Sequence, residues 1–260
     1  MCSLFHKYRD RGWELYHEDK FEEAVAEWRV AADLDPEDGY ILAAIGEALS
    51  KLGQMEAAFG EWQKAIHLEP DYEVPYIYLA DALLEAGYAS KALATIRTSI
   101  RLCLPSANLH IRLGHCLATQ ADENSDKGGW EAATAAFQQA IDIDPVNSYA
   151  HRHLAKTQWA RGQKQEAIST LKAAIAISPS DIELYLILQE YQAATRQFRD
   201  MGQTIDAMNE LPDPEEKIAY YYSDLLNRLW LKLRPILLLG VVLAAVLVGV
   251  LIWNRRGRGA

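Results

Sequence analysis

The sequence predicts an all-α protein, in which stacked helical hairpins form a solenoid and a single membrane-spanning helix follows them. Three observations support this fold class. A pattern of small and large apolar residues recurs along most of the chain. Prolines close successive units at intervals of 34 residues, from Pro36 to Pro70 and from Pro145 to Pro179. Residues 236–253 form one uninterrupted apolar run. Because one hairpin cannot bury its apolar face alone, the repeated hairpins are expected to stack.

The composition excludes several classes of protein. Half of the 260 residues are hydrophobic and 24% are charged, as in a folded chain rather than a disordered or collagen-like one. The net charge of −10 argues against a nucleic-acid partner. Three cysteines are too few for a disulfide scaffold or a zinc site.

The repeating element is a helix that carries a large apolar residue, an alanine and a closing proline, at residues 28–36, 62–70, 137–145 and 171–179. Two further positions hold small residues, where the two helices of a hairpin are expected to approach closely. The first position holds Gly12, Gly46, Ala80, Gly114 and Ala155, and the second Ala24, Ala58, Ala92, Ala133 and Ala167. The large residues are expected to fill the space between neighbouring hairpins: Trp28, Trp62, Ile96, Phe137 and Leu171.

With these residues at this spacing, residues 5–211 resemble the tetratricopeptide repeat (TPR) family. The resemblance implies a helical-hairpin solenoid of five clear repeats, a degenerate sixth repeat and a capping helix. The predicted repeats are 5–38, 39–72, 73–106, 107–147 and 148–181, with the degenerate unit at 182–211.

The fourth repeat is seven residues too long. The surplus falls in residues 121–129, which are mostly polar and contain turn-forming residues, so a flexible loop between two helices is predicted there. Plain length variation explains this loop, and a contact with a binding partner is the alternative.

A further helix is predicted at 213–234, because Asp213, Pro214 and Glu216 form a helix start. We expect this juxtamembrane helix to cap the solenoid with its apolar stripe. Pairing of the same stripe with a second copy, as a short coiled coil, is the alternative and would give weak self-association.

The run 236–253 predicts a transmembrane helix. Its 18 uncharged residues would span roughly 27 Å, close to the thickness of a bilayer's hydrocarbon core. A buried core helix is the alternative, disfavoured because the run has no polar face. Basic residues balance on its two sides, so the positive-inside rule assigns no orientation. The N-terminus has no signal-peptide pattern, and we therefore expect a tail-anchored protein with a cytoplasmic TPR body. The short basic tail, 254–260, is then expected to cross the membrane.

No motif for catalysis is recognised. The sequence has no Gly-rich phosphate loop, nucleophile elbow or metal-protease helix. His151 and His153 stand two residues apart on a predicted helix and diverge, so they do not predict a shared metal ion. The protein is expected not to be an enzyme and to use no cofactor or metal.

The resemblance to TPR proteins implies a protein or peptide partner that binds along the concave face, which the first helix of each repeat lines. The candidate residues on that face are Arg9, Trp13, Tyr40, Glu47, Asp81, His115, Arg152, Lys156 and Trp159. The groove is then acidic in its middle and basic-aromatic at both ends. A solvated inner surface with incidental charges is the alternative interpretation.

These features favour a membrane-tethered adaptor or assembly scaffold for protein partners. Two alternatives share the membrane anchor. One is a receptor for targeting signals or chaperone-borne clients at an organelle surface, and the other is a regulatory subunit of a membrane enzyme.

Overall fold

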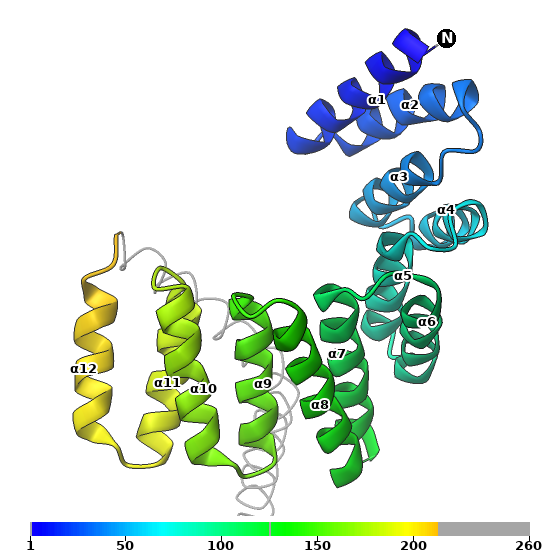
Figure 1. Ribbon diagram of the computed structural model, residues 1–260. Coiled ribbons are helices and arrows are strands. Elements are labelled where there is room, and N and C mark those ends of the chain that lie inside the picture. The colour runs from blue at the N-terminus through cyan, green and yellow to red at the C-terminus, as the bar shows by residue number, and fades with distance from the viewer. Residues whose placement is uncertain (1, 125, 213–260) are drawn as a thin grey trace, which may run out of the picture. The chain divides into compact units, whose positions relative to one another are not determined.

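The computed structural model describes residues 2–124 and 126–212, and these residues form twelve α-helices and no strand (Figure 1). The predicted all-α array of helical hairpins is confirmed. The helices are α1 (Cys2–His17), α2 (Phe21–Leu34), α3 (Gly39–Lys51), α4 (Met55–Leu68), α5 (Glu73–Glu85), α6 (Ala89–Leu102), α7 (Ala107–Asn124), α8 (Lys127–Ile143), α9 (Ser148–Ala160), α10 (Lys164–Ile177), α11 (Ile182–Ala194) and α12 (Phe198–Asn209).

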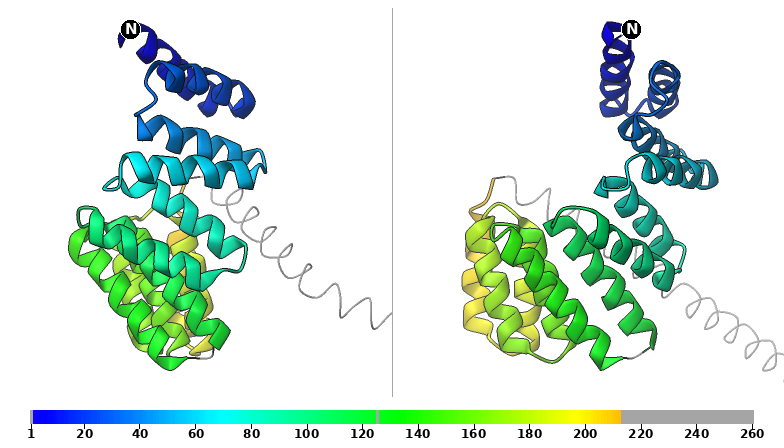
Figure 2. Two further views of the ribbon diagram at one scale, coloured as in Figure 1. Left: turned by 90° about the vertical axis from the view of Figure 1, so that its right-hand side faces the viewer. Right: turned by 45° about the vertical axis from the view of Figure 1, so that its right-hand side comes forward.

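The chain divides into two compact units. The first ends at Ser178 and contains α1 to α10 as five hairpins, each of which contacts the next (Figure 2). The second begins at Pro179, and its described part is the hairpin of α11 and α12. The predicted solenoid, 5–211, extends over both units.

Local sequence explains where the hairpins turn. After α3 the chain reverses at Gly53, whose φ of +73° is a left-handed conformation that glycine adopts without strain. The first helices of two hairpins, α3 and α9, begin at side-chain caps. The carboxylate of Asp38 accepts a hydrogen bond from the Ile41 N–H at 2.9 Å, and the Asn147 side chain accepts one from the Ala150 N–H at 3.1 Å.

The two helices of a hairpin interlock through one large and one small residue. A Cβ atom added at Gly12 would collide with the Trp28 indole, and one added at Gly46 would collide with the indole of Trp62. At Gly114 an added Cβ would lie only 2.7 Å from the ring of Phe137. All three rings are almost completely buried. The three glycines therefore leave the space into which these rings pack.

The expectation that the large residues fill the space between hairpins needs a correction. Each ring first packs against the glycine of its own hairpin, and some rings also reach the next hairpin. The Trp62 ring lies 5.8 Å from that of Tyr78, and the Phe137 ring stacks 5.6 Å from that of His153, measured between centroids. One side chain thus closes its hairpin and contacts the following one.

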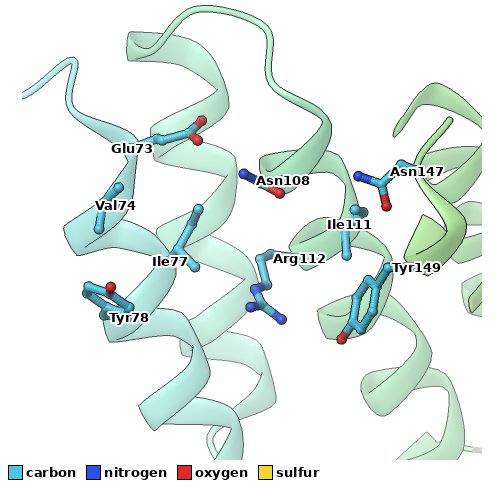
Figure 3. Close-up of a pocket in the computed structure, with 9 residues that line it drawn as sticks. All are labelled: Glu73, Val74, Ile77, Tyr78, Asn108, Ile111, Arg112, Asn147 and Tyr149. Atoms are coloured by element: carbon cyan, nitrogen blue, oxygen red, sulfur yellow. The ribbon is translucent and has the colours of Figure 1, made fainter. Parts of the chain in front are cut away.

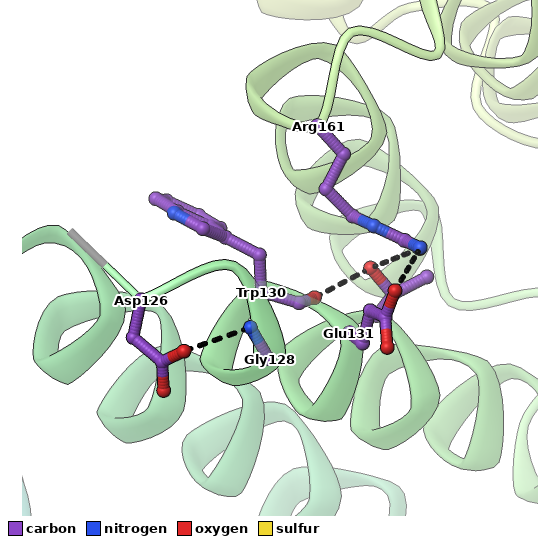
Figure 4. Close-up of polar contacts among 6 residues, drawn as sticks. Asp126, Gly128, Trp130, Glu131 and Arg161 are labelled. Carbon is purple, nitrogen blue, oxygen red and sulfur yellow. Dashed lines mark hydrogen bonds and ion pairs between the residues drawn. The ribbon is translucent and has the colours of Figure 1, made fainter.

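The predicted flexible loop at 121–129 is wrong for most of its length. Helix α7 continues to Asn124 and α8 begins at Lys127, and at 18 and 17 residues both are longer than α3 and α4, with 13 and 14. The cause is that Ala121 is fully buried and that Asp126 caps α8, accepting a hydrogen bond from the Gly128 N–H at 2.9 Å (Figure 4). The surplus residues extend both helices.

The extended hairpin is also tied to the next one. At the end of α9, Arg161 forms an ion pair with Glu131 of α8 at 3.2 Å (Figure 4).

The predicted helix 213–234, transmembrane run 236–253 and tail 254–260 lie outside the described residues. Among the helices that are described, none has both the length and the apolarity required to cross a bilayer.

The interlock predicts opposite effects for one substitution at two helical glycines. Gly46→Ala is expected to lower the free energy of unfolding by about 1 kcal/mol or more, because overpacking against the buried Trp62 outweighs alanine's better helix propensity. Gly60→Ala, where an added Cβ meets nothing within 4 Å, is expected to raise it by about 0.5–1 kcal/mol. Urea unfolding followed by circular dichroism measures both. Equal stabilisation by the two substitutions would contradict the interlock.

Candidate functional site

The first helices of the hairpins in the first unit line a groove with two adjoining hollows. The hollow nearer the N-terminus, called here the aromatic pocket, has a volume of about 430 Å³. Its lining residues are Arg9, Asp10, Trp13, Tyr40, Ala43, Ala44, Glu47, Tyr72, Val74 and Tyr78. They come from α1, α3, α5 and the turn before α5. Three successive hairpins therefore build this pocket.

The second hollow, called here the polar pocket, has a volume of about 380 Å³. Its lining residues are Glu73, Val74, Ile77, Tyr78, Asn108, Ile111, Arg112, Asn147 and Tyr149. Figure 3 shows these side chains coming from α5, from α7 and from the start of α9. Val74 and Tyr78 line both pockets, so the two hollows lie next to each other.

Glu47 is the central carboxylate of the aromatic pocket. The Tyr16 hydroxyl, from the preceding hairpin, donates a hydrogen bond of 2.8 Å to Glu47 Oε1. Burial raises the pKa of Tyr16, and the bond to Glu47 raises it further. Burial and the nearby carboxylate of Glu47 likewise raise the pKa of Tyr78. The hydrogen bond from Tyr16 thus holds the Glu47 carboxylate between the first two hairpins.

Further along the groove, Asp81 of α5 forms an ion pair with Arg112 of α7, at 3.2 Å between Oδ2 and Nη2. Burial raises the pKa of Asp81 despite the opposing effect of Arg112. This pair links the third hairpin to the fourth and places a guanidinium in the polar pocket.

His115 of α7 contacts His153 of α9, with ring centroids 4.2 Å apart, and Tyr149 lies 4.3 Å from His153 on the same measure. Burial lowers the pKa of His115 to about 4 and that of His153 to about 2. Nearby cations, including Arg112 and Lys156, lower both pKa values further. Both imidazoles are therefore neutral at pH 7.

The structure brings together only some of the nine candidate residues. Four line the aromatic pocket: Arg9, Trp13, Tyr40 and Glu47. Asp81 and His115 lie beyond that pocket, in the contacts just described. The three candidates on α9 line neither pocket. The Arg152 guanidinium lies 4.7 Å from the Tyr149 ring centroid, Lys156 is exposed, and Lys164 Nζ lies 5.5 Å from the Trp159 ring.

Sequence reasoning missed four residues of the groove: Tyr72, Tyr78, Arg112 and His153. His153 stands one residue beyond the candidate Arg152, Tyr78 and Arg112 lie on the first helices of their hairpins, and Tyr72 precedes α5. Residues beside the selected positions could have been included as candidates, because the exposed face of a helix is wider than one residue per turn. No signal within a single repeat pairs His115 with His153, because they belong to different hairpins.

Residues 118–182 match the family model of the tetratricopeptide repeat. No curated protein sequence matches the chain. Solved structures share the fold, and three of them are compared with this chain. A thermophilic TPR protein of Thermus thermophilus is 20% identical, with a TM-score of 0.59, and the alignment covers 73% of this chain and 99% of that one.

The type IV pilus biogenesis factor PilW is 15% identical with a TM-score of 0.67, and the alignment covers 83% of this chain and 98% of PilW. Yeast Tom70 is 18% identical with a TM-score of 0.64, and the alignment covers 76% of this chain and 42% of Tom70. At such identities the likeness shows the fold alone. The protein is a helical-repeat protein with a TPR fold, and this fold suggests a scaffold for protein–protein interaction.

The histidine contact predicts a loss of stability in acid. The pKa of His153 is about 2 in the folded chain and about 6.5 in an unfolded one, so below pH 6.5 the unfolded state binds more protons. The free energy of unfolding is expected to fall with decreasing pH, by at most about 1.4 kcal/mol per pH unit for this group. His153→Phe, which keeps a ring in place, should reduce the difference between pH 7 and pH 5 in urea titrations.

The matched control is His67→Phe, at an exposed position of α4, which should leave that pH dependence unchanged. An identical pH dependence in wild type and His153→Phe would show that the imidazole of His153 does not contribute.

Proposed function

We propose that this protein is a membrane-tethered scaffold that binds an extended segment of a protein partner in its groove. The observation that carries the proposal is that the aromatic and polar pockets lie next to each other and that their lining residues together come from all five hairpins of the first unit. Exposed aromatic residues such as Trp13 and Tyr40, 37% and 55% exposed, are the side chains that contribute most to protein interfaces when a partner covers them.

We further propose that the groove acts by binding rather than by catalysis. Several of its polar groups are engaged with one another, as Glu47 is with Tyr16 and Asp81 is with Arg112. The imidazoles of His115 and His153 have pKa values far below neutrality, which makes them weak bases at pH 7. Such groups fix the shape and charge of a binding surface.

Membrane tethering rests on the sequence of residues 236–253. The run is long enough for a bilayer, and Trp230 and Trp253 with flanking basic residues suit its two interfaces. In the proposed arrangement the TPR body lies on the cytoplasmic side. The anchor would hold the groove close to a membrane and raise the local concentration of partners there.

Photo-crosslinking tests the groove. Tyr40 of the aromatic pocket and Tyr88, which precedes α6, are 55% and 54% exposed, so a photoreactive residue at either position samples solvent equally. In membranes of the native host, the probe at Tyr40 is expected to give discrete protein adducts that the probe at Tyr88 does not. The same adducts from both positions would place partner binding elsewhere.

Truncation tests the tether. Deleting residues 229–260 is expected to move the protein from the alkaline-resistant membrane pellet to the supernatant, because the apolar run leaves with the deleted part. In intact vesicles, protease added on the cytoplasmic side should digest the TPR body of the full chain. Full-length protein in the supernatant would exclude the anchor, and a protected body would reverse its orientation.

A further inference from the structure

The aromatic pocket carries an excess negative charge at Glu47. Its lining contains three charged side chains, and two of them cancel: Arg9 is bound to Asp10 by hydrogen bonds of 2.8 and 2.9 Å. Within residues 2–124 and 126–212, no cation pairs with Glu47, and the Tyr16 hydroxyl donates a hydrogen bond to its carboxylate. The carboxylate is held in place without being neutralised.

Aromatic rings share the pocket with this carboxylate. Trp13, Tyr40, Tyr72 and Tyr78 line the same pocket. The rings of Tyr40 and Tyr72 lie 4.3 Å apart, and Trp13 packs edge-on against the buried Trp28 at 4.9 Å, both measured between centroids. These contacts hold the rings in position. Cations bind favourably over the faces of such rings.

The neighbouring surface adds to the negative charge. Glu47 also lines a smaller hollow whose other charged lining residues are Lys51, Glu85 and Asp81, the last of which is paired with Arg112. On the other side, Glu73 lines the polar pocket together with Arg112. A groove lined by carboxylates attracts positively charged groups before contact is made.

We propose that the aromatic pocket binds an arginine side chain of an extended partner segment. The inference rests on the proposed function and specifies its partner. A guanidinium is flat, so it stacks on the rings, and its donors match the carboxylate of Glu47. It is also less strongly hydrated than an ammonium group, so it enters a partly buried pocket at a lower desolvation cost. The ligand is therefore a segment with an arginine at one defined position.

Two peptide libraries test this with the full chain in detergent micelles. Both contain ten-residue peptides that are random except at one central position, which holds arginine in one library and citrulline in the other. Citrulline keeps the size of arginine and removes its charge. Retention of the arginine library is expected to exceed that of the citrulline library by about tenfold, the contribution of one hydrogen-bonded charge.

The variant Glu47→Gln distinguishes arginine binding in the aromatic pocket from general attraction of cations to an acidic protein. This variant should retain both libraries about equally, whereas Glu56→Gln, an equal charge change at an exposed position of α4, should keep the arginine excess. Equal retention by wild type, or an arginine excess that survives Glu47→Gln, would overturn the inference. Crosslinking at Tyr40 without any arginine preference would overturn this inference and leave the proposed scaffold in place.

Discussion

The fit of one large side chain on one glycine is the contact on which the rest of the first unit depends. The same contact recurs in three hairpins, as Trp28 packs on Gly12, Trp62 on Gly46 and Phe137 on Gly114. These rings are 0%, 2% and 1% exposed, so no space remains for another rotation of one helix against the other. The two helices of each of these hairpins consequently have one register.

That register determines the chemistry of the groove. The second helix of each hairpin packs on the same side of the first helix, so successive first helices present the same face to one another. Polar side chains from different hairpins meet on that face. Glu47 accepts a hydrogen bond from the hydroxyl of Tyr16 in the hairpin before it. This donor stabilises a carboxylate that has no cation beside it.

Two features departed from what local sequence suggested, for the same reason. Residues 121–124 are mostly polar, yet they remain helical because Ala121 is buried in the hairpin and Asp126 caps the following helix. The sequence of its own helix does not identify His153 as part of the groove, but its ring packs against His115 of the previous hairpin. In both cases a tertiary contact outweighed local propensity.

The sequence by itself determined that the described chain is a set of helical hairpins, because small and large apolar positions that recur every 34 residues are buried only when such hairpins stack. It also placed Arg9, Trp13, Tyr40 and Glu47 on one face. Only the tertiary structure decided that these four share a pocket with Tyr72 and Tyr78 and that the candidate Trp159 does not line it. The reason is that a repeat pattern defines each hairpin, whereas pockets depend on the rotation between hairpins, which contacts between distant residues set.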